Sequence, residues 1–182
     1  MKTVRRQLLE KLSRELTQSE LDAERQTTRE ANRLGDVEPA RRLRAIAAHA
    51  AHIRPRLNRI VHHNQPIGWE VARLVGELFS AARHFAVDRI LSTERSYRAT
   101  LLGVHHGIDA ACLLRDVARR EEHVRLHRYC DDMIAERETL LREAQHALVW
   151  FADHPDIVSA SGARIALLSN RNARREIALH AV

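Results

Sequence analysis

The sequence predicts an all-α protein, an up-and-down bundle of four or more long antiparallel helices. The chain of 182 residues contains only 6 Gly and 4 Pro, fewer turn-forming residues than a β-sandwich or barrel requires. Apolar residues recur at steps of three and four along most of the chain, the spacing that lines one face of an α-helix. Hydrophobic residues make up 45% of the chain, which is enough to form a core at this length.

The first expected helix covers residues 1–34, which we interpret as an N-terminal helical arm. Its first half carries an apolar residue at every fourth position: Val4, Leu8, Leu12 and Leu16. Residues 17–34 are mostly polar, so we expect them to project from the bundle or to be partly disordered unless a partner covers them. Leu21 and Leu34 are therefore candidate partner-binding residues.

The bundle proper is expected to occupy residues 36–156. Gly35 predicts the end of the first helix, and Pro39 suits the first turn of the next. That helix has an inward seam at steps of three and four, Leu43, Ile46, Ala50, Ile53, Leu57 and Ile60. Pro55 is expected to kink it.

Three more apolar stripes follow in the same region. The first is Val71, Leu74, Leu78, Ala82 and Phe85, and the second is Tyr97, Leu101, Val104, Ile108 and Ala111. These two stripes belong either to one long bent helix or to two helices, the second capped at Ser92-Thr93. A turn is expected between Ala118 and Glu122. The last stripe predicts a helix over 122–152, with Leu126, Cys130, Met133, Arg137, Leu140, Ala144, Ala147 and Phe151 inward.

Residues 157–182 are expected to form a basic C-terminal tail. This segment contributes +3 of the formal net charge of +6. A basic tail is where an acidic partner would bind, so Arg171, Arg174 and Arg175 are candidate partner-binding residues.

Small residues at every fourth position, Gly103, Gly107 and Ala111, form a ridge that another helix could approach closely. The ridge suits either packing inside the bundle or a contact between two molecules. We include these three residues among the candidate partner-binding residues.

Two charged residues, Glu94 and Arg137, stand on otherwise apolar stripes. If both face inward they should pair, because an unpaired buried charge costs several kcal/mol. Such a pair more often fixes helix register than performs catalysis.

Besides His84/Asp88, three further pairs of metal-ligand residues have helical spacing: His105/Asp109, His123/His127 and Glu143/His146. Residues at i and i+4 share a helix face and can reach one metal ion. The first two pairs resemble the H-x-x-x-E and H-x-x-x-H pairs of hemerythrin-like bundles, with Asp109 in place of Glu, and the third is similar to the E-x-x-H pair of ferritin-like proteins. The resemblance implies a di-iron or other transition-metal site. The alternative is that these histidines lie on an exposed surface.

Other signatures of chemistry are missing from the sequence. Cys112 and Cys130 lack C-x-x-C spacing, and there is no P-loop, G-x-S-x-G or dinucleotide fingerprint. No apolar run approaches the length of a membrane span, and the charged start does not resemble a signal peptide. We therefore expect a cytoplasmic protein without a cofactor.

The histidine-rich composition, 12 residues, predicts a net charge that rises below about pH 6.5. Taken together, the sequence favours a non-enzymatic protein that acts by helix-mediated self-association or by docking to a protein partner. The alternative is a metal-binding bundle for oxygen, iron or stress response. Nucleic-acid binding through the arginine faces is a third hypothesis.

Overall fold

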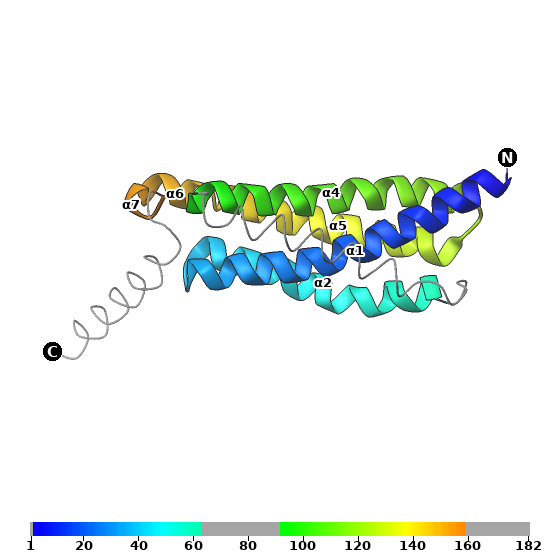
Figure 1. Ribbon diagram of the computed structural model, residues 1–182, viewed down its shortest axis with the longest axis horizontal. Coiled ribbons are helices and arrows are strands. Elements are labelled where there is room, and N and C mark those ends of the chain that lie inside the picture. Colours follow the sequence, from blue (N-terminus) through cyan, green and yellow to red (C-terminus); the bar gives the residue numbers. More distant parts are fainter. Residues whose placement is uncertain (1, 63–91, 159–182) are drawn as a thin grey trace.

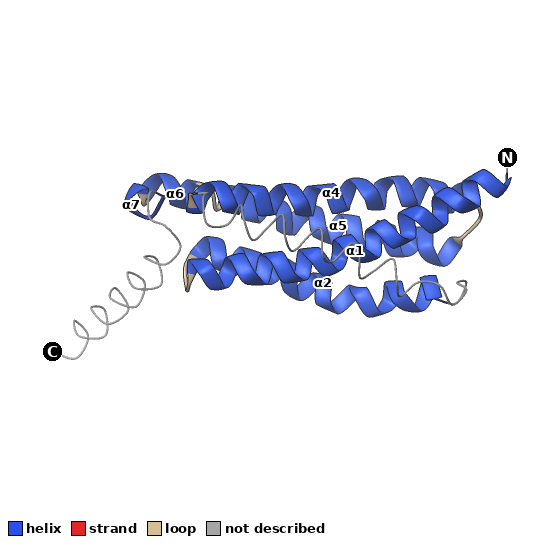
Figure 2. Ribbon diagram, in the orientation of Figure 1, coloured by secondary structure: helices blue, strands red, loops and turns tan. Residues whose placement is uncertain are grey.

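The structure is a computed structural model that describes residues 2–62 and 92–158, and all regular structure in this part of the chain is helical (Figure 2). The helices are α1 (Lys2–Leu34), α2 (Glu38–His62), α4 (Thr93–Arg120), α5 (Val124–His146), α6 (Val149–Asp153) and α7 (Pro155–Val158). The four long helices pack antiparallel, which confirms the predicted fold class. The predicted helix that begins after His62, with Val71 and Phe85, lies outside the described residues.

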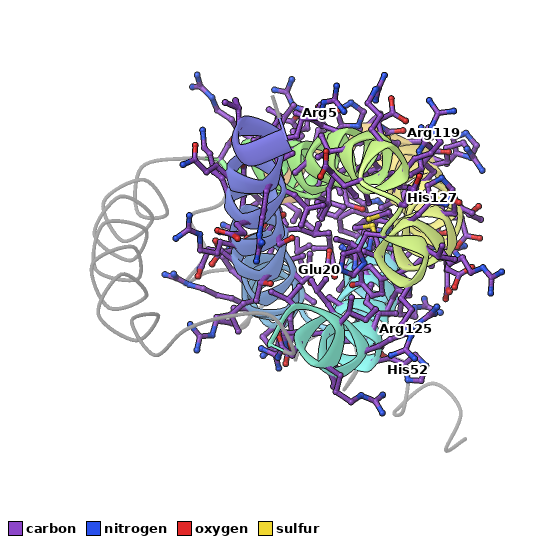
Figure 3. The ribbon with its side chains drawn as sticks, turned by 90° about the vertical axis from the view of Figure 1, so that its right-hand side faces the viewer. Arg5, Glu20, His52, Arg119, Arg125 and His127 are labelled. Atoms are coloured by element: carbon purple, nitrogen blue, oxygen red, sulfur yellow. The ribbon has the colours of Figure 1, made fainter. Side chains whose placement is uncertain are left out.

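The four long helices are arranged in a ring. Helix α1 packs against α2 and α4, and α5 packs against the same two helices. Neighbouring helices run in opposite directions (Figure 1), so the diagonal pairs, α1 with α5 and α2 with α4, run in the same direction. The core lies along the axis of this ring, as the end-on view shows (Figure 3).

Helix ends fall where the turn residues predict them. Gly35 adopts φ 82°, and its N–H donates to the carbonyl of Ala31 at 3.1 Å, which ends α1. Ser92 precedes the first residue of α4, although its hydroxyl makes no capping hydrogen bond. The turn expected between Ala118 and Glu122 is present, because α4 ends at Arg120 and α5 begins at Val124.

The N-terminal helix is one wall of the bundle, so the expectation that residues 17–34 project is wrong. Its inward positions alternate by four and three along the whole helix. They are the partly buried Leu9 and the buried Ser13, Leu16, Glu20, Ala23, Thr27, Glu30 and Leu34. Half of these residues are polar, which is why an apolar stripe was not visible in the sequence.

The inward stripes predicted for the described helices α2, α4 and α5 are confirmed. Leu43 and Ile46 of α2 belong to the core cluster. Ile53 and Ile60 of the same helix are partly buried and pack against this cluster. The last long helix ends at His146 rather than 152, and α6 follows after two residues. Phe151 of α6 still packs into the core, with its ring centroid 5.3 Å from that of Tyr97. The aromatic end of the chain's last stripe therefore closes one end of the bundle.

Candidate functional site

A charged cluster lies in the middle of the bundle, where three helices meet. Arg137 of α5 is 1% exposed and Glu20 of α1 is 0% exposed. The Nη2 atom of Arg137 donates to Oε2 of Glu20 at 2.7 Å, and its Nε donates to Nδ1 of the buried His49 of α2 at 3.0 Å. Figure 3 shows Glu20 pointing into the ring. The cluster therefore ties α1, α2 and α5 together.

The predicted pairing of Arg137 with Glu94 is wrong. Glu94 is half-buried and makes an ion pair with Arg98, one turn along the same helix. The register of the bundle explains the difference. The hydroxyl of Tyr97, three residues after Glu94, donates to the carbonyl of Ala144, which lies seven residues, about 10 Å, beyond Arg137. Glu94 is thus displaced along the bundle axis, and Glu20 lies opposite Arg137.

Burial shifts the pKa of both partners of Arg137. It raises the pKa of Glu20, and the Arg137 guanidinium opposes this rise. Burial and the positive charge of Arg137 lower the pKa of His49 to about 4. Because Nδ1 of His49 accepts from Arg137, the neutral ring carries its proton on Nε2, which lies 3.3 Å from Oε2 of the exposed Glu136.

The cluster has the properties of a structural ion pair. Tyr129 is buried next to it, and neither its hydroxyl nor Oε1 of Glu20 has a hydrogen-bond partner among the described residues. None of Glu20, His49 and Arg137 lines the cleft between α1 and α4, whose volume is about 370 Å³. Because the cluster joins three helices inside the core, it fixes which helix faces meet and at what height.

A second polar junction joins the end of α1 to the start of α4. Arg33 donates to both carboxylate oxygens of Glu30, at 2.9 and 2.5 Å, and to the carbonyl of Thr93 at 3.1 Å. The hydroxyl of Ser96 donates to Oε2 of the buried Glu30 at 3.0 Å. Glu30, a polar residue in the stretch expected to project, is therefore hydrogen-bonded inside the bundle.

The small-residue ridge packs against α1. A Cβ atom at Gly107 would lie 2.5 Å from Oγ of Ser19, and one at Gly103 would lie 3.5 Å from Oε1 of Gln26. Gly107 and Ala111 are buried, so they are not available to a second molecule. Gly103 is exposed and borders the cleft between α1 and α4.

The remaining predicted partner-binding residues have different positions. Leu34 belongs to the core, so its assignment to a partner surface is wrong. Leu21 is half-buried. Arg171, Arg174 and Arg175 lie outside the described residues.

The predicted metal ligands do not converge within residues 2–62 and 92–158. His105, Asp109 and His146 are exposed, and His123 is half-buried. His127 lies 3.1 Å from Asp131 on its own helix, and Glu143 pairs with Arg42 of α2 at 3.0 Å. No group of three or more His, Cys, Asp or Glu side chains that could hold a metal ion occurs in this part of the chain.

The outward side of α4 carries large apolar side chains in solvent. Leu102 is 71% exposed and Leu113 is 50% exposed. They are eleven residues apart, three helical turns, and so share one face. The inward stripe dominates the apolar periodicity of this segment, so the outward leucines do not stand out in the sequence.

Comparison with protein-family models, curated proteins and solved structures finds no match for this chain. Within the described residues, no helix has the length and apolar character needed to cross a membrane.

Proposed function

We propose that this protein is non-enzymatic and acts by helix-mediated association, with itself or with a protein partner. The observation that carries the proposal is the pair of exposed leucines, Leu102 and Leu113, on the outward face of α4. We take these two leucines, which share one solvent-exposed helix face, as the centre of a contact surface.

The composition of the interior supports the same proposal. The buried charged groups, Glu20 and Arg137, neutralise each other and stabilise one helix register. The candidate metal ligands that the structure describes are spread over the surface. No observation in this part of the chain favours the metal-binding alternative.

Sedimentation velocity on the full chain tests the proposal. We expect the sedimentation coefficient to rise with protein concentration at tens of micromolar, as a monomer converts to a larger species. A monomer that persists throughout this range would count against self-association.

A further inference from the structure

The outward side of α4 carries an unbroken seam that begins at Arg95 and ends at Arg120. Its positions alternate by four and three residues, the repeat of a coiled-coil stripe. They are Arg95, Ala99, Leu102, His106, Asp109, Leu113, Asp116 and Arg120, which we call the α4 outer face. All are exposed except Asp116, which is partly exposed. The stripe is about 39 Å long at 1.5 Å per residue.

The α4 outer face is complementary to itself when read in the reverse direction. Its midpoint lies between residues 107 and 108, so Leu102 and Leu113 are equally far from it. His106 and Asp109 are also placed symmetrically about this point. In an antiparallel pair of identical helices, Leu102 would therefore meet Leu113 of the second copy, and His106 would meet Asp109.

We propose that two copies of this protein associate through the α4 outer face, with the two α4 helices antiparallel about a twofold axis near residues 107 and 108. This inference rests on the proposed function and names its surface and partner. A twofold contact uses the same patch on both molecules, and this patch provides two leucine layers and two histidine–aspartate layers.

Charge decides the direction of the pair. A parallel arrangement would place Asp109 against Asp109 and His106 against His106, whereas the antiparallel one places unlike groups together. His106 remains 67% exposed although its Nε2 lies 3.4 Å from Oε1 of Glu15. The seam would bring Arg95 near Arg120 of the second copy. In each copy, Oδ2 of Asp116 lies 4.0 Å from Nη1 of Arg120, so a carboxylate is present beside the two arginines.

Substitution of Leu102 tests the surface by sedimentation velocity on the full chain. Leu102→Glu places two carboxylates in the leucine layers, so we expect dimerisation to weaken by roughly a hundredfold or more. Val149→Glu is the matched control, because Val149 of α6 is 66% exposed and lies outside the seam. This control should dimerise like the wild type, with unchanged helical content for both variants.

A charge exchange tests the polar layers. His106→Asp should weaken the dimer, because in each of the two polar layers it sets one carboxylate against Asp109 of the other copy. Adding Asp109→His to the same chain exchanges the two groups and should restore most of the dimer. Failure of the double variant to recover would contradict the proposed facing of these residues.

Disulfide cross-linking tests the direction. Leu102→Cys and Leu113→Cys proteins are prepared separately in a Cys112→Ser background. Cys130 is kept, because it is buried and its pKa is raised to about 12 by burial. Mixing the two proteins under mild oxidation should give a cross-linked dimer, and neither protein alone should do so.

The outcomes separate this inference from the proposed function. If the wild type associates and the Leu102→Glu variant associates equally well, the antiparallel α4 pair is overturned and association stands. The same holds if the Leu102→Cys protein cross-links to itself. A wild-type protein that stays monomeric overturns both.

Discussion

At the scale of single residues, Arg137 is the most unusual member of the bundle core. Its guanidinium is buried and makes hydrogen bonds to Glu20 and His49 on two other helices. A buried ion pair adds little net stability compared with a well-packed apolar pair, but removing one partner leaves an uncompensated charge. Arg137 therefore acts on the choice of helix register more than on total stability.

A single and a double substitution test this interpretation. Glu20→Gln leaves the buried guanidinium without its counter-charge and should lower the free energy of unfolding by about 3 to 5 kcal/mol. Combining Glu20→Met with Arg137→Met removes both charges and should recover most of that loss. Urea denaturation measures each protein, and equal losses for the single and double variants would refute the pairing.

His49 makes stability depend on pH. The unfolded imidazole takes up its proton near pH 6.5 and the folded one only near pH 4, so between these values the unfolded state binds more protons. The contribution of His49 is therefore complete above pH 6.5 and is lost as the pH falls toward 4. Arg137 and Glu136 face this ring and act on it in opposite directions.

The variant His49→Asn isolates this effect, because its amide oxygen can accept from Arg137 and does not titrate. The stability difference between wild type and variant should shift in the variant's favour between pH 6.5 and 4. Glu20 titrates in both proteins and cancels from the comparison. Parallel pH curves from urea denaturation would show that His49 is not the titrating group.

At the scale of helices and turns, the bundle is held in register by polar contacts at several heights. The central cluster joins α1, α2 and α5, and the Glu30–Arg33–Ser96 junction joins α1 to the start of α4. Gly107 lets α1 approach α4, because a side chain there would collide with Ser19. These contacts fix the height of each helix, which apolar stripes alone specify less closely.

The backbone of the turn between α4 and α5 is locally strained at one residue. Glu122 adopts φ 57°, the left-handed region that favours glycine. The N–H of His123 donates to the carbonyl of Ala118 at 2.8 Å, and that of Glu122 donates to Arg119 at 3.2 Å, the hydrogen bonds of a Schellman motif.

Glu122→Gly should therefore raise the free energy of unfolding by roughly 0.5 to 1 kcal/mol. Thermal unfolding followed by circular dichroism measures the change. Glu121→Gly is the matched control, because Glu121 has φ −98° and gains nothing from glycine. A stabilised Glu121→Gly variant, or a destabilised Glu122→Gly variant, would contradict this account of the turn.

At the scale of the whole molecule, the four long helices already bury their inward seams in one copy. Among the described residues, the α4 outer face carries two large apolar residues in solvent among polar ones. Few residues would therefore carry association, and the dimer should be sensitive to concentration.

Coupling between folding and association gives a further expected result. Because a dimer stabilises the folded state by mass action, the wild-type melting temperature should rise with protein concentration. The Leu102→Glu variant should melt at one temperature over the same range, and Val149→Glu should behave like the wild type. A wild-type melting temperature that is independent of concentration would argue against a dimer of folded chains.

From the amino-acid sequence alone we could predict the helical fold class, the inward stripes of α2, α4 and α5, and the helix ends at Gly35 and near Glu122. These features follow from local periodicity and turn chemistry, which act over a few neighbouring residues. Three other features depend on how the helices pack: α1 is a wall of the bundle, Glu20 rather than Glu94 faces Arg137, and the histidine pairs of the described region stay apart. Whether a polar residue is buried, and which partner it meets, depends on the relative height of the helices along the bundle axis. Residues far apart in the chain set that height together.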